Sequence, residues 1–345
     1  MTEAARGNER PLVVLRAAPH PASRIFTPAA WAALRERYDV VDLSDDDRPE
    51  SLDAALPEAF AVIGQPDLPA ERLRRAPRLR AVLNVEGNFF PNVDYETCFA
   101  RGISVLGCGP AYAQAVAEHA LGLALDLARG ISREDRAFRS GTEHYVAEGN
   151  EESVLLRGST VGLLGYGNLG RALHRLLVPF DAHLRVHDPW LPDAVLRQAG
   201  LHPAGLDETI AQSRFLFVLA TVTAQTEHLL GARELDLVPR GGRLVLVSRA
   251  AVCDFDALLP RLREGRLLAA VDVWPEEPVP AGSPFREVAG LVFSGHRAGG
   301  IPQAFTEIGD MVLDDLRQIE RGLPPVRMQA AARELVGRYR NRPVP

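Results

Sequence analysis

The chain has 345 residues, of which 46% are hydrophobic and 24% are charged, a composition that excludes a disordered or fibrous protein and suggests two domains of roughly 150 residues each. Its 39 basic and 45 acidic residues give a net charge of −6, and no block of basic residues stands out. The sequence therefore lacks the basic patch that is typical of proteins that bind nucleic acid or an anionic membrane. We therefore expect a small molecule as the partner.

From its start the chain alternates short apolar runs with helical stretches. Helix starts are indicated by Thr27 with Pro28 after it, by Ser51 and by Pro69. Because a helix follows each strand, the alternation predicts a parallel sheet. The predicted strands are 12–15, 40–43, 60–64, 81–85 and 103–106.

A long helix, predicted over about 114–129, separates this part from a second half that repeats the alternation. Six further apolar runs suit a doubly wound sheet of the Rossmann type. These predicted strands are 161–164, 184–187, 215–219, 244–247, 268–272 and 291–293.

After Gly299 and Gly300, a helix predicted over 302–321 precedes a basic, proline-flanked tail that we expect to return to the first half. The predicted fold class is therefore α/β with a discontinuous first domain, 1–110 and 301–345, and a second domain, 111–300.

A glycine-rich turn follows the strand predicted at 161–164 and opens an apolar-faced helix, which is the proper context of G-x-G-x-x-G. Gly165 permits the tight turn, Gly167 lets backbone N–H groups approach a pyrophosphate, and Gly170 lets the helix pack closely on the strand. Asn168 and Leu169 complete the predicted phosphate-binding loop. A turn without a ligand is the alternative.

The next strand ends at Asp188, eighteen residues beyond Gly170, where a carboxylate accepts hydrogen bonds from ribose hydroxyls. A carboxylate repels a 2′-phosphate, and Pro189 and Trp190 offer no arginine to neutralise one, so NAD is favoured over NADP. A capping or surface aspartate is the alternative.

Three polar residues stand near strand ends late in the second half. The planar fork of Arg249 suits a carboxylate, and His296 suits proton transfer near neutrality. Glu277 is suited to hold the second imidazole nitrogen and to favour its charged form. Each residue taken separately is more often structural.

Together these features resemble the D-isomer-specific 2-hydroxyacid dehydrogenases over nearly the whole chain. The matching pieces are 156–173, 187–189, 221–226, Arg249, 272–278 and 296–300, with 92–94, 101–103 and 116–118 in the first part.

The resemblance implies a catalytic set in which Arg249 binds and orients a 2-oxo acid, His296 supplies the proton and Glu277 tunes His296. It also implies NAD as cofactor and no metal, and no His-Glu-x-x-His spacing occurs in the chain. The further cofactor-binding residues that it implies are Thr221, Thr226, Ser248 and Asp272, the last against the nicotinamide amide.

The resemblance further implies a flavodoxin-like first domain, joined to the cofactor domain by crossings near 109–113 and 299–303. A backbone loop of that domain, Gly87, Asn88 and Phe89, would bind the substrate carboxylate. Phe89 replaces a usual glycine, and its ring either contacts substrate or closes the cleft, or else packs beneath the loop.

Other departures from the family cluster near the predicted site. Arg297, beside His296, is expected either to read a second anionic group of the substrate or to lie in solvent or near a helix dipole. Tyr112 and Trp274 are further candidates, more often core or interface residues. Leu246, Ala250, Thr221 and Gly295 stand where the family usually has Asn, Gly, Pro and Pro.

The lysine and cysteine content excludes several classes of enzyme and of site. The chain contains no lysine, which excludes a Walker P-loop and a pyridoxal Schiff base. Its three cysteines are too few for a disulfide framework, and neither a signal peptide nor a membrane segment is recognisable, so a cytoplasmic location is expected.

The resemblance also implies a homodimer joined through helices around 117–138.

Three alternatives remain open at this point. The first is an NAD-sensing corepressor without turnover, because a fold does not prove an activity. The second is a formate- or phosphite-type dehydrogenase, although Glu277 argues against formate. The third, a methyltransferase, leaves Arg249, Glu277 and His296 without a role.

Overall fold

The computed structural model describes residues 10–87 and 89–340, which form two compact units. The first unit runs to Tyr112 and resumes at Ile301, and the second comprises Ala113–Gly300. The chain crosses between the units after Tyr112 and again after Gly300.

The first unit is built on a six-stranded sheet in the order β13-β5-β4-β3-β1-β2. The five predicted strands are present and parallel, and the order β2-β1-β3-β4-β5 is flavodoxin-like, as predicted. The tail adds β13, which pairs antiparallel with β5. The strands are β1 (Leu12–Arg16), β2 (Asp39–Asp42), β3 (Ala59–Gly64), β4 (Ala81–Asn84), β5 (Ser104–Gly107) and β13 (Gln329–Ala330).

The helices of this unit begin largely where proline and capping residues predict. Thr27 Oγ1 accepts a hydrogen bond from Ala30 N at 3.1 Å, which confirms that N-cap. The predicted cap at Ser51 is wrong: the helix already starts at Pro49, whose fixed φ suits the first turn, and the Ser51 hydroxyl donates to Asp46 instead. The helices are α1 (Ala22–Ile25), α2 (Pro28–Arg37), α3 (Pro49–Ala55), η1 (Leu56–Glu58), α4 (Ala70–Arg74), α5 (Tyr95–Arg101), α13 (Pro302–Glu320) and α14 (Arg333–Val336).

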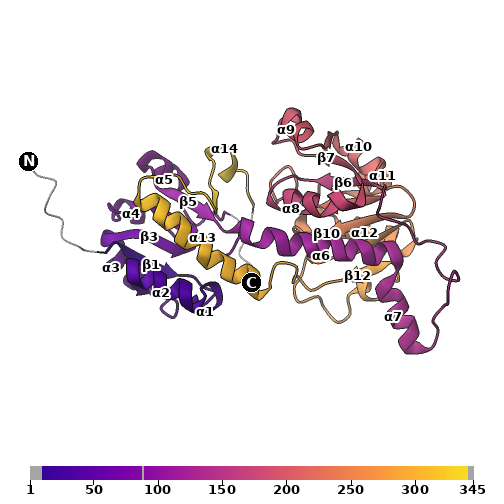
Figure 1. Ribbon diagram of the computed structural model, residues 1–345, viewed down its shortest axis with the longest axis horizontal. Helices are drawn as coiled ribbons and strands as arrows, with labels where there is room; N and C mark the ends of the chain where they lie inside the picture. The colour runs from indigo at the N-terminus through magenta and orange to yellow at the C-terminus, as the bar shows by residue number, and fades with distance from the viewer. Residues whose placement is uncertain (1–9, 88, 341–345) are drawn as a thin grey trace, which may run out of the picture. The chain divides into compact units, whose positions relative to one another are not determined.

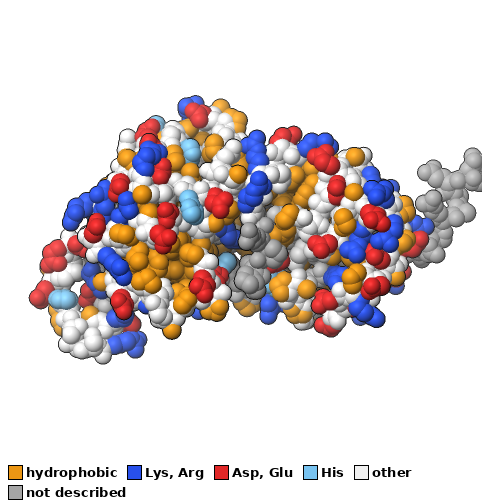
Figure 2. Space-filling view, turned by 180° about the vertical axis from the view of Figure 1, so that it is seen from behind, with side chains coloured by type: hydrophobic (Ala, Val, Ile, Leu, Met, Phe, Trp, Pro, Cys, Tyr) orange, Lys and Arg blue, Asp and Glu red, His pale blue; other side chains and the backbone are white. Residues whose placement is uncertain are grey.

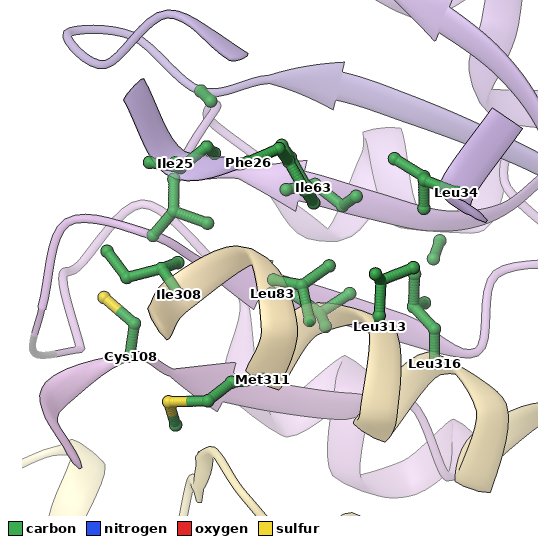
Figure 3. Close-up of a cluster of buried hydrophobic side chains, with 14 of the residues drawn as sticks. Ile25, Phe26, Leu34, Ile63, Leu83, Cys108, Ile308, Met311, Leu313 and Leu316 are labelled. Atoms are coloured by element: carbon green, nitrogen blue, oxygen red, sulfur yellow. The ribbon is translucent and has the colours of Figure 1, made fainter. Parts of the chain in front are cut away.

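Helix α13 belongs to the core of the first unit although it follows the second unit in sequence. It lies alongside α1 and α2 (Figure 1). Its side chains Ile308, Met311 and Leu316 belong to the same buried cluster as Leu83 and Ile25, which Figure 3 shows in close-up. All five side chains are almost completely buried, so the first unit needs both chain segments to complete its core.

A buried carboxylate ties α13 to the tail. Asp315 is fully buried, and its oxygens accept hydrogen bonds from the backbone N–H groups of Val326, Arg327 and Met328 at 2.7, 3.0 and 2.7 Å. These bonds hold the chain that leads into β13.

Replacing this carboxylate is expected to destabilise the first unit. Asp315→Ala leaves three backbone donors unpaired and should cost about 3 kcal/mol of unfolding free energy. Asp310→Ala, at an exposed position of the same helix, is the control and should change stability by no more than about 0.5 kcal/mol. Equal denaturant midpoints for the two variants would contradict the assigned role of Asp315.

The second unit contains a seven-stranded, wholly parallel sheet in the order β12-β11-β10-β9-β6-β7-β8, which confirms the doubly wound Rossmann class. All six predicted strands are present, and a two-residue edge strand, β8, was not predicted. The strands are β6 (Thr160–Leu164), β7 (His183–His187), β8 (His202–Pro203), β9 (Phe215–Val218), β10 (Gly242–Leu246), β11 (Leu267–Val271) and β12 (Leu291–Phe293).

Helices cover this sheet on both faces. Helices α10, α11 and α12 share a buried apolar cluster with one face, whereas fully buried alternate residues such as Leu163 and Phe217 point to the other. Figure 1 shows α6 and α8 over the sheet. The helices are α6 (Gly109–Arg129), which begins in the first unit, α7 (Ile131–Ser140), α8 (Asn168–Leu177), η2 (Val178–Phe180), α9 (Asp193–Gln198), α10 (Leu206–Ala211), α11 (Ala232–Leu237), η3 (Ala250–Val252), α12 (Phe255–Arg263) and η4 (Pro284–Glu287).

The surface carries charges of both signs. Arginine and acidic side chains are interspersed over the face visible in Figure 2. Across residues 10–87 and 89–340, each helix is too short or too polar to cross a membrane.

Candidate active site

The parallel strands of the second unit end at one edge of the sheet, and the predicted cofactor and catalytic residues follow those ends. The strand order reverses between β6 and β9, which is where doubly wound sheets bind dinucleotides. Gly165 follows β6, Asp188 follows β7, Thr221 follows β9, Ser248 and Arg249 follow β10, Asp272 follows β11, and His296 follows β12.

The glycine turn after β6 has the geometry that a phosphate-binding loop needs. Gly165 has φ +99°, and a Cβ there would lie 3.0 Å from Ala220 N. A Cβ on Gly170 would lie 2.6 Å from the Gly165 carbonyl oxygen, so glycine is required for the close approach of helix and turn. Gly167 is exposed, and a Cβ there would meet nothing within 4 Å. Asn168 and Leu169 form the first turn of α8. Of the three glycines, only Gly167 therefore leaves open space in which a ligand could lie.

Asp188 is bound to this turn. Its Oδ2 accepts from Tyr166 N at 2.7 Å, and its Oδ1 accepts from Trp190 N at 3.0 Å. The Tyr166 hydroxyl lies 2.8 Å from His174 Nδ1, and burial raises the pKa of Tyr166 and lowers that of His174. Each carboxylate oxygen retains a second lone pair for a ribose hydroxyl.

Two hydroxyls after β9 and β10 are buried without a hydrogen-bond partner in the described part of the chain: Thr221 Oγ1 and Ser248 Oγ. A buried unpaired hydroxyl is unusual and is free to bond to a ligand that reaches it. Thr226 differs, because its hydroxyl donates to the Thr221 carbonyl at 2.6 Å and accepts from Thr223 N at 2.8 Å, within its own turn. The open glycine loop and the two orphaned hydroxyls fit a dinucleotide.

His296 and Glu277 form a close pair. Nδ1 of His296 lies 2.7 Å from Glu277 Oε2, and the two side chains are 27% and 24% exposed. Oε1 of Glu277 accepts from Trp274 N at 2.8 Å, which fixes the carboxylate. Because Nδ1 is engaged, Nε2 is the imidazole nitrogen left to exchange a proton with a substrate.

Asp272 supports the turn that carries His296. Its buried carboxylate accepts from the Ser294 hydroxyl, from Arg297 N at 3.0 Å and from Ala298 N at 3.2 Å. Its carbonyl oxygen accepts from His296 N at 2.6 Å. The Asp272 carboxylate thus anchors the turn, a structural role that the sequence did not indicate. Its contact with a nicotinamide amide stays a prediction.

Arg249 is half-buried in extended backbone (φ −148°, ψ 140°), three residues beyond β10. Its Nη1 donates to the Ser248 carbonyl at 2.7 Å, which steadies the guanidinium. Strand β11 lies between β10 and β12, so Arg249 and His296 follow strands two places apart on the same edge. The Arg297 side chain is exposed.

The predicted carboxylate-binding loop lies in the first unit, after β4. Gly87 has φ +131°, and Asn88 lies outside the described residues. The Phe89 ring is only 4% exposed and packs in the core, 6.3 Å from the Tyr95 ring and 5.9 Å from the Tyr339 ring. Of the alternatives for the Phe89 ring, packing beneath the loop is therefore the one that the structure shows.

The remaining aromatic candidates also pack. Trp274 is 7% exposed and stacks on Phe293 at 5.6 Å, and its Nε1–H donates to the Ser294 carbonyl at 2.8 Å. Tyr112 lies edge-on to Phe305 at 6.1 Å.

Two residues of the site escaped sequence reasoning: Ser294 and His119. Ser294 directly follows β12 and was open to the same strand-end argument as His296. His119 lies on α6 and reaches Ser294 Oγ at 3.0 Å across a sequence separation of 175 residues, which no local pattern indicates.

Comparisons with known proteins agree with this geometry. A family model described as D-isomer specific 2-hydroxyacid dehydrogenase, NAD binding domain, matches residues 121–298. The solved structure of a phosphoglycerate oxidoreductase from Rhizobium etli is 45% identical, with a TM-score of 0.86 over 94% of this chain and 99% of that one.

Two groups of curated relatives are similar along most of the chain. D-3-phosphoglycerate dehydrogenase of Mycobacterium bovis is 30% identical over 85% of this chain and 55% of its own, so the chain spans about half the length of that relative. Glyoxylate reductase of Aeropyrum pernix is 28% identical over 88% of this chain and 93% of its own.

Proposed function

Because the chain belongs to the D-isomer-specific 2-hydroxyacid dehydrogenase family, we propose that it is an NAD-dependent oxidoreductase that interconverts a 2-oxo acid and a D-2-hydroxy acid. The observation that carries the proposal is the 2.7 Å pair of His296 and Glu277, which stands on the sheet edge that also bears Arg249 and the glycine turn. An acid paired with a carboxylate at a cofactor edge suits carbonyl reduction.

The residues divide the work of reduction. NADH, when bound, supplies the hydride that C2 of the substrate receives. Arg249 grips the substrate carboxylate through two parallel hydrogen bonds and stabilises negative charge on the carbonyl oxygen. His296 gives that oxygen a proton from Nε2, while Glu277 holds Nδ1 and stabilises the imidazolium. Oxidation of the hydroxy acid reverses these steps.

Gly87 and the main chain of Phe89 are proposed to bind the substrate carboxylate from the first unit, with Asn88 between them. The first unit, 1–110 with 301–345, would then be the substrate domain and 111–300 the cofactor domain. The positive φ of Gly87 and the buried anchor of the Phe89 ring support a loop of defined backbone shape.

The second glycine of the turn offers a selective test of cofactor binding. In Gly167→Ala the new methyl group meets no protein atom within 4 Å, so the fold should be kept, but it occupies the space proposed for the pyrophosphate. We expect the Kd for NADH, measured by fluorescence quenching, to rise at least about tenfold, or about 1.4 kcal/mol. Gly282→Ala, equally open, is the control. Unchanged affinity in Gly167→Ala would contradict the proposed cofactor site.

The exposed Arg297 is proposed to select substrates with a second anionic group. Relatives named phosphoglycerate oxidoreductase and D-3-phosphoglycerate dehydrogenase support a phosphorylated substrate, and one named glyoxylate reductase supports a small one. A guanidinium beside the proton donor suits the former.

A substrate panel tests the proposed activity. NADH oxidation is measured with glyoxylate, hydroxypyruvate, pyruvate, phenylpyruvate and phosphonopyruvate, and Arg297→Gln should raise the KM for phosphonopyruvate more than that for glyoxylate. A protein that binds NADH but oxidises none with any 2-oxo acid would overturn the proposed activity and favour an NAD-sensing binding protein.

A homodimer is proposed, joined through the helices around 117–138. Helix α7 buries none of its residues, and Ile131 and Phe138 are 60% and 64% exposed. The segment that follows exposes Tyr145, Val146 and Leu155. Such a run of exposed apolar side chains suits contact with a second copy.

Charge placed on this helix should separate the subunits. Ile131→Asp with Phe138→Asp should reduce the mass measured by light scattering from twice 37.6 kDa to 37.6 kDa. Leu323→Asp, which changes an exposed leucine of the first unit, is the control and should leave the dimer intact. A dimer that persists in the double variant would overturn this interface.

A cytoplasmic location is also proposed. The three cysteines are unpaired and buried, and burial raises the pKa of each to about 12, so all remain protonated thiols. Free thiols suit a reducing compartment.

A further inference from the structure

A chain of hydrogen bonds leads from α6 to the turn of His296. Nε2 of His119 lies 3.0 Å from Ser294 Oγ, and the Ser294 hydroxyl donates to Asp272 Oδ1. A hydroxyl has one proton, and Ser294 uses it in the hydrogen bond to the Asp272 carboxylate. Ser294 Oγ can therefore only accept a hydrogen bond from His119, whose Nε2–H is the donor. The direction of each bond in the chain is thereby determined.

Asp272, the last residue in this series of hydrogen bonds, is buried and accepts several of them. Asp272 is 1% exposed, and its carboxylate binds the N–H groups of Arg297 and Ala298 besides the Ser294 hydroxyl. Ser294 is held a second time, because its carbonyl oxygen accepts from Trp274 Nε1 at 2.8 Å. The turn 294–298 is therefore fixed from both sides of His296.

The backbone of His296 needs such support. Its φ is +49°, in the left-handed region that a histidine rarely adopts, and the residue before it is Gly295, which adds no stiffness of its own. Such a conformation persists only where surrounding contacts impose it. Loss of one contact should let the turn, and with it the imidazole, occupy other positions.

We propose that His119 is a positioning residue for His296: its Nε2–H holds the Ser294 hydroxyl toward Asp272, and this link keeps the turn 294–298 in the conformation that aims the imidazole. The kinetic consequence rests on the proposed function, whereas the structural one does not. His119 lies 3.0 Å from Ser294 Oγ and 3.7 Å from Asp272 Oδ1, the carboxylate oxygen to which the Ser294 hydroxyl donates, so it acts on the turn through this one cluster.

Hydrogen exchange in the cofactor-free protein tests the structural consequence. In His119→Leu, the amides of Arg297 and Ala298 should exchange at least about tenfold faster, while those of β6 and β9 keep their rates. His119→Gln retains an N–H donor and should restore wild-type exchange. Ser294→Ala removes the same link without altering α6 and should act like His119→Leu. Unchanged exchange at Arg297 and Ala298 in His119→Leu, or equal acceleration throughout the sheet, would overturn the proposal.

Kinetics test the consequence for the reaction. His119→Leu should lower kcat about tenfold with KM within about twofold of wild type, and His119→Gln should recover most of the loss. Because His119 and Ser294 both contact Asp272 Oδ1 and each other, the double variant His119→Leu with Ser294→Ala should lose clearly less than the product of the two single losses. Losses that multiply in the double variant would overturn the proposal. A wild-type protein inactive on every 2-oxo acid would refute the proposed function, and the exchange rates would then decide this inference alone.

Discussion

His296→Ala is expected to lower kcat for 2-oxo acid reduction at least about a hundredfold, because His296 is the one proton donor to the carbonyl oxygen in the proposed mechanism. The Kd for NADH should stay within about twofold, since His296 is a proton donor and not a cofactor contact. Initial rates at saturating substrate and fluorescence titration measure the two quantities.

Two further variants sharpen this test. Glu277→Gln keeps a hydrogen-bond partner at Nδ1 but removes the negative charge, so it should show a smaller loss than His296→Ala. His183→Ala, at the opposite end of β7, is exposed and should be fully active. Full activity in His296→Ala would remove the histidine from the mechanism.

Arg249→Gln is expected to lower kcat/KM about a thousandfold, equivalent to about 4 kcal/mol of lost transition-state stabilisation. The guanidinium is proposed to bind the carboxylate in the ground state and the developing oxyanion in the transition state, so KM should rise and kcat should fall together. Glutamine offers neither the positive charge nor the two parallel donors.

Arg249→Lys separates charge from geometry. Lysine keeps the positive charge but loses the planar fork, so activity should lie between those of wild type and Arg249→Gln. Arg263→Gln, at the exposed carboxyl end of α12, is the matched control and should leave kcat/KM unchanged. A KM that does not respond to loss of Arg249 would contradict its role in binding the carboxylate.

Local patterns carried much of the fold. Each predicted strand is present, because a buried parallel strand must be a short apolar run and the turn after β6 must be built of glycines. The long helix α13 and the return of the tail also followed from the order of the elements. The two strands that were missed, β8 and β13, have two residues each, too few for any periodicity.

The strand-end residues of the second unit could likewise be named from the sequence. A parallel sheet brings all carboxyl ends to one edge, so Asp188, Arg249 and His296 were assigned to that edge without coordinates. The spacing of Glu277 from His296 did not give their 2.7 Å contact, for which the sequence offered only a chemical expectation.

Only the tertiary structure decided what several side chains do. It turned the Phe89 ring into the core, made Asp272 the anchor of a turn, buried Asp315 beneath the tail and brought His119 to Ser294. Sequence determines which backbone a segment prefers, because that preference depends on near neighbours. Contacts between distant segments depend on how packed elements finally meet, and the same aspartate or phenylalanine is compatible with several such outcomes until the surrounding chain has closed around it.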